Sequence, residues 1–229
     1  FIKNTTNYNT DLIKSLSTKF NLDEEIIKLL FTRGFDSEEK IDNFLNPSVT
    51  SFHNPFLLKN MREVVDKINY YLTNNKSITI VGDYDTDGIC ATAILYKYFE
   101  SIGHKVSTFL PQRLLDGYGL SNDTIDKIIS MYKPDLIITV DCGISSYKEV
   151  EYCKEKGIDI IITDHHDIPD ILPDTLVVNA KLPDQMYPFK ELCGAGVAFK
   201  LVQAMSGLEN ALKYTSIASL ATVADIVPI

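Results

Sequence analysis

The sequence predicts an α/β fold in which a parallel sheet has helices on both faces, preceded by a small helical N-terminal unit. Two observations support this prediction. From Ser77 onward, short apolar runs rich in β-branched residues alternate with longer stretches of helical periodicity. Each run carries apolar residues on both faces, which is typical of strands covered on both sides. Strands that alternate with helices build a parallel sheet.

The N-terminal part contains helical patterns only. Apolar residues recur at helical spacing over residues 11–45, and after a turn at Asn54-Pro55 the pattern over 59–72 predicts another helix. We therefore expect residues 1–75 to form a helical N-terminal region. Residues 76–229 are expected to form the α/β domain.

The elements of the α/β domain follow one another with short connections. Ser121 is a plausible N-cap for one of its helices, because a hydroxyl there can accept from the first free backbone N–H groups. We expect strands at 78–81, 106–110, 136–140, 158–163 and 176–178, and helices at 89–101, 121–132, 146–156, 194–205 and 211–222.

The composition is that of a globular protein in a reducing compartment. Hydrophobic residues make up 45% of the chain and charged residues 23%. No apolar run approaches the ~20 residues of a membrane span, so we expect a cytoplasmic protein without membrane contact. The four cysteines form no C-x-x-C pair, which argues against a zinc ribbon or a disulfide framework. Buried thiols are expected instead.

The charge balance bears on the substrate. The net charge is −9, of which residues 76–229 carry −8. Nucleic-acid binders are usually basic, because contacts to phosphates supply much of their affinity. The acidity leaves three alternatives: the substrate is not a polyanion, bound cations offset the carboxylates, or the basic surface lies outside this sequence.

Acidic and imidazole side chains follow three of the predicted strands. In an open parallel sheet, ligands bind in the crevice at the carboxyl ends of the strands. Three separate segments are therefore expected to bring titratable groups to one edge of the sheet. These groups are Asp83, Asp85 and Asp87 after the first strand, Asp141 after the third, and Asp164, His165 and His166 after the fourth.

Divalent cations would make such a cluster stable. Several carboxylates packed together without cations repel one another and lose solvation. Oxygen ligands with one or two imidazoles suit Mn²⁺ or Mg²⁺, whereas thiolates favour zinc. Two ions about 3.5–4 Å apart can activate a water and stabilise the leaving oxygen in phosphoryl displacement. The residues thus predict two Mn²⁺ or Mg²⁺ ions, which Asp141 could bridge.

Other interpretations of the same residues remain to be weighed. The Asp83–Gly88 loop resembles the start of a calcium-binding EF loop, but its twelfth position is Ile94 instead of glutamate and a strand precedes it. A helix cap is the better interpretation of Asp123 and Asp167, and for Asp141 cap and ligand are both open. Independent caps need not converge on one sheet edge, so together the residues favour a metal site.

Four motifs resemble those of a known family. They are D-Y-D-x-D-G at 83–88, T-V-D-C-G at 139–143, D-H-H at 164–166 and A-D-I-V-P at 224–228. The sequence resembles the DHH phosphoesterases, and among them most closely the RecJ single-strand-specific exonucleases. The resemblance covers nearly the whole chain, since it extends to 30–34, 44–47, 54–56, 111–113 and 116–120.

The resemblance implies roles for individual residues. It implies a parallel-sheet DHH phosphoesterase domain in which Asp141 bridges the metals and His166 contacts the scissile phosphate, while Asp164 orients His165. Asp83 is either a ligand or a neighbour of one. The implied catalytic residues are His166, Asp141 and Asp87, and the implied metal ligands are Asp83, Asp85, Asp87, Asp141, His165 and Asp225.

Three further residues are candidates for substrate contact alongside His166. Arg113 is the only arginine after residue 75, and its planar fork suits a phosphate oxygen, the alternative being a surface salt bridge. Gly194 and Gly196 open a predicted helix whose N–H groups could approach a phosphate. Close helix packing explains the two glycines equally well.

The resemblance implies an activity. It implies that two metal ions support hydrolysis of phosphodiester bonds in single-stranded DNA. The implied direction is 5′→3′, and the implied processes are DNA repair and recombination. A repair helicase and a single-strand-binding protein are possible partners of an expected monomer. RecJ-like chains continue past the D-I-V-P segment into a DHH-associated domain and an oligonucleotide-binding barrel, and those parts would supply the basic surface.

Two rival functions stay open. One is a DHH-family oligoribonuclease or nucleotide phosphatase, whose first motif usually reads His-x-N-P-D-x-D; here Val81 and Asp83 stand at the His and Asn positions. The other is a non-catalytic binding module of DNA replication. Such modules lose ligands, whereas every expected ligand is present here.

Overall fold

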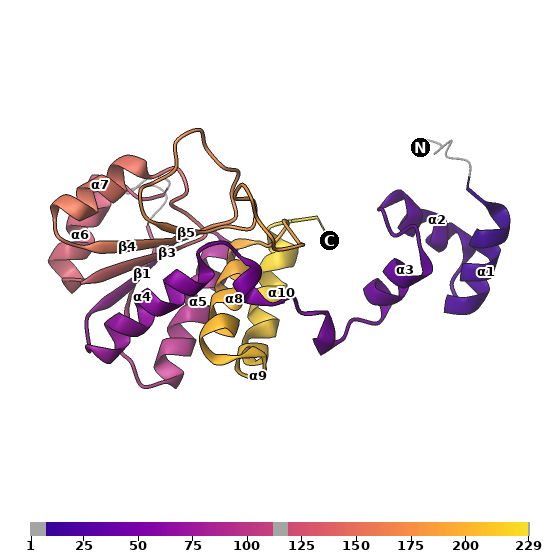
Figure 1. Cartoon of the computed structure of the whole chain (residues 1–229), viewed down its shortest axis with the longest axis horizontal. Coiled ribbons are helices and arrows are strands. Elements are labelled where there is room, and N and C mark those ends of the chain that lie inside the picture. The colour runs from indigo at the N-terminus through magenta and orange to yellow at the C-terminus, as the bar shows by residue number, and fades with distance from the viewer. Residues whose placement is uncertain (1–7, 112–118, 229) are drawn as a thin grey trace. The chain divides into compact units, whose positions relative to one another are not determined.

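The computed structural model describes residues 8–111 and 119–228, and the chain separates into two compact units, Phe1–His53 and Asn54–Ile229. Within its described residues, the first unit has the α-helices α1 (Thr10–Phe20), α2 (Glu24–Thr32) and α3 (Glu38–Leu45) (Figure 1). Side chains of Asn9, Asp23 and Ser37 cap their N-termini. The helices close around a small apolar core of Ile13, Leu16, Ile27, Leu30 and Ile41.

The second unit is built on a sheet of five parallel strands, which confirms the predicted fold class. The strands lie in the order β2-β1-β3-β4-β5. All five residues of β1 and of β3 are buried, as continuously apolar strands require when both faces are covered. The strands are β1 (Ile78–Gly82), β2 (Ser107–Phe109), β3 (Leu136–Val140), β4 (Asp159–Thr163) and β5 (Leu176–Val178).

Helices cover both faces of this sheet, as Figure 1 shows. On one face, α6 and α7 pack apolar side chains such as Ile128 and Val150 against Ile137 and Ile160 of the central strands. On the other face, α5 and α8 pack against each other, with α4 and α10 beside them. The helices are α4 (Met61–Thr73), α5 (Thr86–Ser101), α6 (Asn122–Tyr132), α7 (Tyr147–Glu155), α8 (Gly194–Ser206), α9 (Leu208–Ala211) and α10 (Thr215–Ala224).

The strand order locates the ligand crevice. From β1 the chain passes through α5 to β2 at one edge of the sheet, and from β2 it returns through α6 to β3 on the other side of β1. The segments that follow the neighbouring strands β1 and β3 therefore run toward opposite edges of the sheet. The crevice at the carboxyl ends of two such strands is where open α/β sheets bind ligands.

The compact units divide at residues 53 and 54, which differs from the expected boundary at 75 and 76. The reason is the packing of α4, which contacts α8 and β5. Its buried Met61 and Ile68 belong to the core of the second unit, and Asn60 Nδ2 donates to the carbonyl oxygen of Val177 at 2.8 Å. A helix assigned by sequence to the N-terminal region is thus part of the sheet domain by its contacts.

Two helices differ from the sequence prediction by three residues or more at one end. Helix α5 begins at Thr86, three residues before the predicted start, because Asp85 accepts a hydrogen bond from Gly88 N and caps the helix. The last predicted helix is divided into α9, a 3₁₀ turn over Leu212–Tyr214, and α10.

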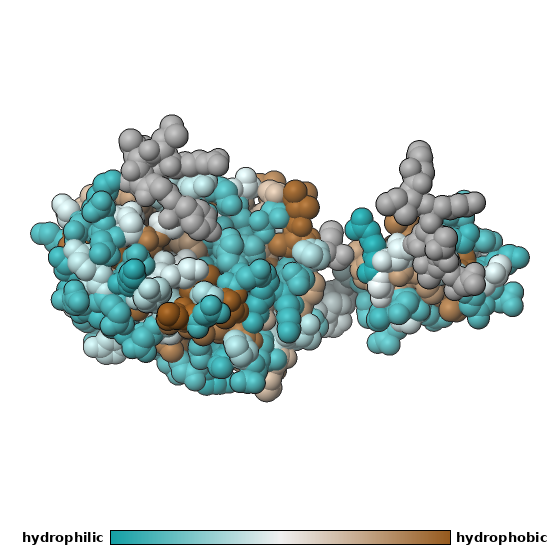
Figure 2. Space-filling model, turned by 90° about the horizontal axis from the view of Figure 1, so that it is seen from above, coloured by the Kyte–Doolittle hydropathy of each residue, from teal (hydrophilic) through white to brown (hydrophobic). Residues whose placement is uncertain are grey.

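The surface and the thiols agree with the composition. The face of the second unit seen in Figure 2 is mainly hydrophilic, with small hydrophobic patches. All four cysteines are free and buried, as expected. Over the described ranges, no helix combines the length and the apolar character needed to cross a bilayer.

Candidate metal centre

The turn from β1 into α5 presents three aspartates. Asp83 and Asp87 are buried, while Asp85 is exposed at the N-cap of α5. Tyr84 N donates to Asp83 Oδ1 at 2.7 Å, which fixes that carboxylate against the turn. Gly88 has no room for a side chain, because a Cβ there would lie 2.5 Å from the carbonyl oxygen of Asp83. The tight turn therefore depends on a glycine at position 88.

Asp141 stands at the end of β3 and is not a helix cap. Its backbone is left-handed, with a φ of 61°, and α7 begins several residues later after Ser146. The side chain is 1% exposed. Its Oδ1 is buried and receives no hydrogen bond of normal geometry from any described residue, with His165 Nε2 lying 3.1 Å away. Of the two alternatives left open by the sequence, a cap and a ligand, this geometry favours the ligand.

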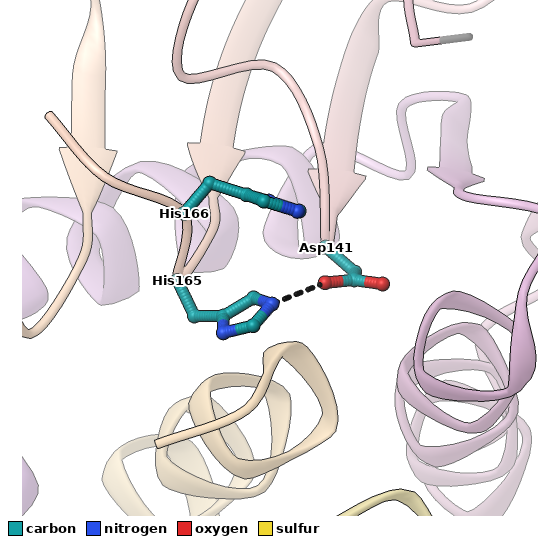
Figure 3. A group of neighbouring side chains, drawn as sticks. All are labelled: Asp141, His165 and His166. Carbon is teal, nitrogen blue, oxygen red and sulfur yellow. Dashed lines mark ion pairs between the residues drawn. The ribbon is translucent and has the colours of Figure 1, made fainter. Parts of the chain in front are cut away.

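His165 lies at the centre of the acidic cluster. Its Nε2 is 3.1 Å from Asp141 Oδ1, and Figure 3 shows the ring turned toward that carboxylate. The same nitrogen is 3.7 Å from Asp87 Oδ2 and 3.7 Å from Asp225 Oδ2. One imidazole nitrogen thus faces carboxylates from β3, α5 and the end of α10.

Asp164 orients His166, which corrects the sequence expectation that it orients His165. Its Oδ1 accepts from the His166 ring at Nδ1, at 2.7 Å, and from the backbone N–H groups of His165 and His166. Its Oδ2 accepts from Ile144 N at 2.9 Å, which ties the segment after β3 to the segment after β4. The sequence could not distinguish the two rings, because the direction of each depends on the turn after β4.

Asp225 enters the cluster from a distant part of the chain. It follows α10, and α10 packs against α5 and α8. Sequence spacing relative to the strands gives no reason to place Asp225 here, and only the family resemblance singled it out.

The donor set suits divalent cations. Three groups of side chains each bring their ligand atoms within 4.8 Å of one another, and Asp141 and His165 each belong to two of them. Oxygen donors with one or two imidazoles match Mn²⁺ or Mg²⁺. The groups are Asp83, Asp85 and Asp141; Asp87, His165 and Asp225; and Asp141, His165 and His166.

The electrostatics of the cluster also call for cations. Burial raises the pKa of Asp141 to about 10, and the neighbouring carboxylates of Asp87 and Asp85 add to the shift. Burial also raises the pKa values of Asp83 and Asp225. A bound cation would offset the repulsion that favours their protonated forms, so metal binding is expected to release protons.

These shifts predict how pH affects stability without metal. Between the unfolded pKa near 3.8 and the folded pKa of about 10, Asp141 holds more proton in the folded state. The free energy of unfolding should therefore fall as pH rises from 5 to 9, by at most about 1.4 kcal/mol per pH unit from this residue. Thermal melting in EDTA measures the slope, which Asp141→Asn should flatten. If Asp141→Asn has the same slope as the wild type, the raised pKa of Asp141 is not the source of the pH dependence.

The structure describes two of the three further residues predicted to contact the substrate, Gly194 and Gly196. Gly194 N and Ala195 N donate to Asp87 at 2.6 and 2.7 Å, and Gly196 N donates to Cys193 Sγ at 3.3 Å. These N–H groups already have partners within the protein, so the geometry favours close packing, the alternative left open for the two glycines. Arg113 lies outside the described residues.

Asn179 is a residue that sequence reasoning missed. It is fully buried at the end of β5, and its Nδ2 donates to the His166 carbonyl at 2.9 Å while its Oδ1 accepts from Lys181 N. Gln185 Nε2 donates to the Asn179 carbonyl at 2.7 Å. An asparagine after an apolar strand usually marks a turn, so nothing in the sequence singles it out.

We expect Asn179→Asp to lower kcat by about 10- to 100-fold with Mn²⁺ affinity unchanged, as for other residues that support a site indirectly. The variant keeps the acceptor for Lys181 N but places an oxygen opposite the His166 carbonyl. Steady-state kinetics and calorimetry check both expectations. Gln185→Leu is the matched control, because it removes the bond to the Asn179 main chain and the bond from Lys59 N but leaves the bond from Asn179 Nδ2 to the His166 carbonyl in place. Equal rates in wild type and Asn179→Asp would rule out a role of Asn179 in supporting His166.

Comparisons with known proteins agree with this fold. A model of the DHH family, N-terminal domain, matches residues 77–225. The chain is 39% identical over 220 residues to the single-stranded-DNA-specific exonuclease RecJ of Bacillus subtilis. That alignment covers 96% of this chain and 28% of the relative, so the chain spans little more than a quarter of that protein.

The solved structures that resemble the chain include two of RecJ bound to manganese. A crystal structure of exonuclease RecJ bound to manganese matches with a TM-score of 0.68 and 38% identity, over 75% of this chain and 44% of that one. RecJ of Thermus thermophilus in complex with Mn²⁺ matches with a TM-score of 0.75 and 31% identity, over 95% of this chain and 31% of that one.

Proposed function

The chain belongs to the DHH family, and we propose that it is the catalytic part of a metal-dependent exonuclease that degrades single-stranded DNA from the 5′ end. The observation that carries this proposal is the set of three ligand groups that are linked through Asp141 and His165. The similarity to RecJ supports single-stranded DNA as the substrate.

The residues assigned to the metals come from four segments. We assign Asp141 to both ions, because it lies between the carboxylates of the β1–α5 turn and His165. Two bound Mn²⁺ or Mg²⁺ ions would activate a water and stabilise charge on the phosphate and the leaving oxygen. The proposed ligands are Asp83, Asp85, Asp87, Asp141, His165 and Asp225.

His166 is proposed to contact the scissile phosphate. Its side chain is 41% exposed, compared with 11% for His165, so it is the imidazole that a substrate can reach. The hydrogen bond that the ring donates to Asp164 raises the pKa of His166, which favours the imidazolium form. With Nδ1 held by Asp164, the ring would present Nε2 as a charged donor to a phosphate oxygen.

The acidity of the chain is compatible with a DNA substrate. The buried carboxylates are the site for the cations, and those cations would reverse the local charge. Because the chain spans 28% of its Bacillus subtilis relative, we propose that other parts of the protein bind most of the DNA phosphates. A cytoplasmic monomer that acts with a repair helicase and a single-strand-binding protein fits this role.

The test compares substrates with the full-length protein and Mn²⁺. Labelled single-stranded DNA, duplex DNA, short RNA and pyrophosphate would be offered in parallel, with an EDTA control. We expect 5′-mononucleotides from single-stranded DNA, and a label at the 5′ end should be released first. Cleavage restricted to the short RNA and pyrophosphate would refute the exonuclease proposal, and so would release of the 3′ label first.

A further inference from the structure

The first turn of α8 donates two hydrogen bonds to a carboxylate of the metal centre. Gly194 N donates to Asp87 Oδ2 at 2.6 Å, and Ala195 N donates to Asp87 Oδ1 at 2.7 Å. Both oxygens of Asp87 are thus held by consecutive backbone donors that are part of a regular helix. Because these donors cannot rotate as a side chain can, α8 fixes the position of the carboxylate as well as its orientation.

These two hydrogen bonds are compatible with metal binding by Asp87. Each carboxylate oxygen has two lone pairs, so it can accept one N–H bond and still offer an electron pair to a cation. The partial positive charge at the N-terminus of α8 also stabilises the anion that a metal needs as its ligand.

The same turn of α8 touches Asp141. A Cβ at position 194 would lie 2.4 Å from Asp141 Oδ1 and 2.5 Å from Asp141 Cβ, which is closer than real Cβ contacts. Asp141 cannot easily retreat, because its N–H donates to the Thr163 carbonyl at 3.0 Å and its φ of 61° belongs to a tight left-handed turn. Only a glycine at position 194 allows α8 to approach this closely.

Gly194 therefore contacts two carboxylates from different segments: it donates to Asp87 and packs against Asp141. We infer that Gly194 is a positioning residue that sets the spacing between Asp87 and Asp141, and thereby the simultaneous binding of two cations. This inference rests on the proposed two-metal function. It assigns the first turn of α8 to the protein's own carboxylate instead of a substrate phosphate.

Gly196 provides a matched control. It lies in the same helical turn, but a Cβ there would meet only side-chain atoms, the nearest being Leu192 Cδ2 at 3.3 Å. Both substitutions, Gly194→Ala and Gly196→Ala, remove one helical glycine and add one methyl group. A general effect of glycine replacement on α8 would appear in both variants, whereas a shift of Asp141 would appear in one.

The experiment measures metal binding in the full-length protein. Calorimetry with Mn²⁺ gives the number of ions and their affinities, and electron paramagnetic resonance detects coupling between two neighbouring Mn²⁺ ions. We expect a coupled pair in wild type and in Gly196→Ala. In Gly194→Ala we expect the coupled signal to be lost and the affinity for one ion to fall at least tenfold, while the metal-free protein still melts cooperatively.

The outcomes separate the inference from the proposed function. A wild-type protein without a coupled pair refutes the two-metal function, and the inference falls with it. A coupled pair that persists in Gly194→Ala at wild-type affinity refutes the inference alone, as does its loss in Gly196→Ala.

A second variant decides the case in which Gly194→Ala does not fold. The double variant Gly194→Ala/Asp141→Gly removes the atoms that the new methyl group would strike, and glycine tolerates the left-handed backbone at position 141. Recovery of a cooperative melting transition supports the contact. Continued failure to fold shows that Asp141 is not what Gly194 accommodates.

Discussion

Asp141→Ala is expected to lower kcat by about 10³-fold or more, which corresponds to a loss of about 4 kcal/mol of transition-state stabilisation. The reason is geometric. Asp141 lies between the carboxylates of the β1–α5 turn and His165, so its loss removes a ligand from both proposed ions. Turnover of single-stranded DNA at saturating Mn²⁺ measures the effect on kcat, and calorimetry measures the bound ions.

The fate of the metals distinguishes a bridging ligand from an ordinary one. If Asp141 bridges, the variant should retain at most one Mn²⁺ and bind it more weakly. Asp123→Ala is the control, because it removes one exposed aspartate from the first turn of α6. Normal activity in Asp141→Ala, or two ions bound at wild-type affinity, would show that the proposed metal assignment is wrong.

His166→Ala is expected to lower kcat by about 10²- to 10³-fold while Mn²⁺ binding is retained. That is the range for removing one donor that stabilises developing charge on an oxygen. The ring is the more exposed of the two imidazoles and is oriented by Asp164. His166→Gln should recover part of the rate, because an amide N–H can donate to phosphate but carries no charge.

Calorimetry decides between two roles that the geometry allows for His166. Its ring nitrogens lie within reach of a group that includes Asp141 and His165, so it could also be a metal ligand. Unchanged Mn²⁺ affinity in His166→Ala together with a lower kcat supports phosphate contact. Loss of bound Mn²⁺ would make His166 a ligand instead.

Most of the sheet domain could be predicted from residue order. Continuous apolar runs such as Leu136–Val140 form buried strands in any context that covers both faces, so the β3 prediction was confirmed to the residue. The start of α5 was predicted three residues late, because Asp85 was counted as a loop residue while its side chain caps the helix. The position of α4 could not be predicted, since helical periodicity reveals an apolar face but not what that face meets.

The residues of the candidate site could also be predicted only in part. Asp83, Asp85, Asp87, Asp141 and the D-H-H triplet follow parallel strands, and such strands end at one edge of the sheet. The sequence therefore predicted their convergence, and their chemistry predicted divalent cations. The family resemblance contributed DNA and the exonuclease activity, which stay proposals for this chain.

Only the tertiary structure decided which groups touch. It directed Asp164 to His166 instead of His165, added Asn179 behind that imidazole, and placed the first turn of α8 between Asp87 and Asp141. The physical reason is the range of the interactions. The period of a strand and the chemistry of a carboxylate are local properties that residue order carries, whereas a contact of 2.6 Å between residues 87 and 194 depends on how α5 and α8 pack.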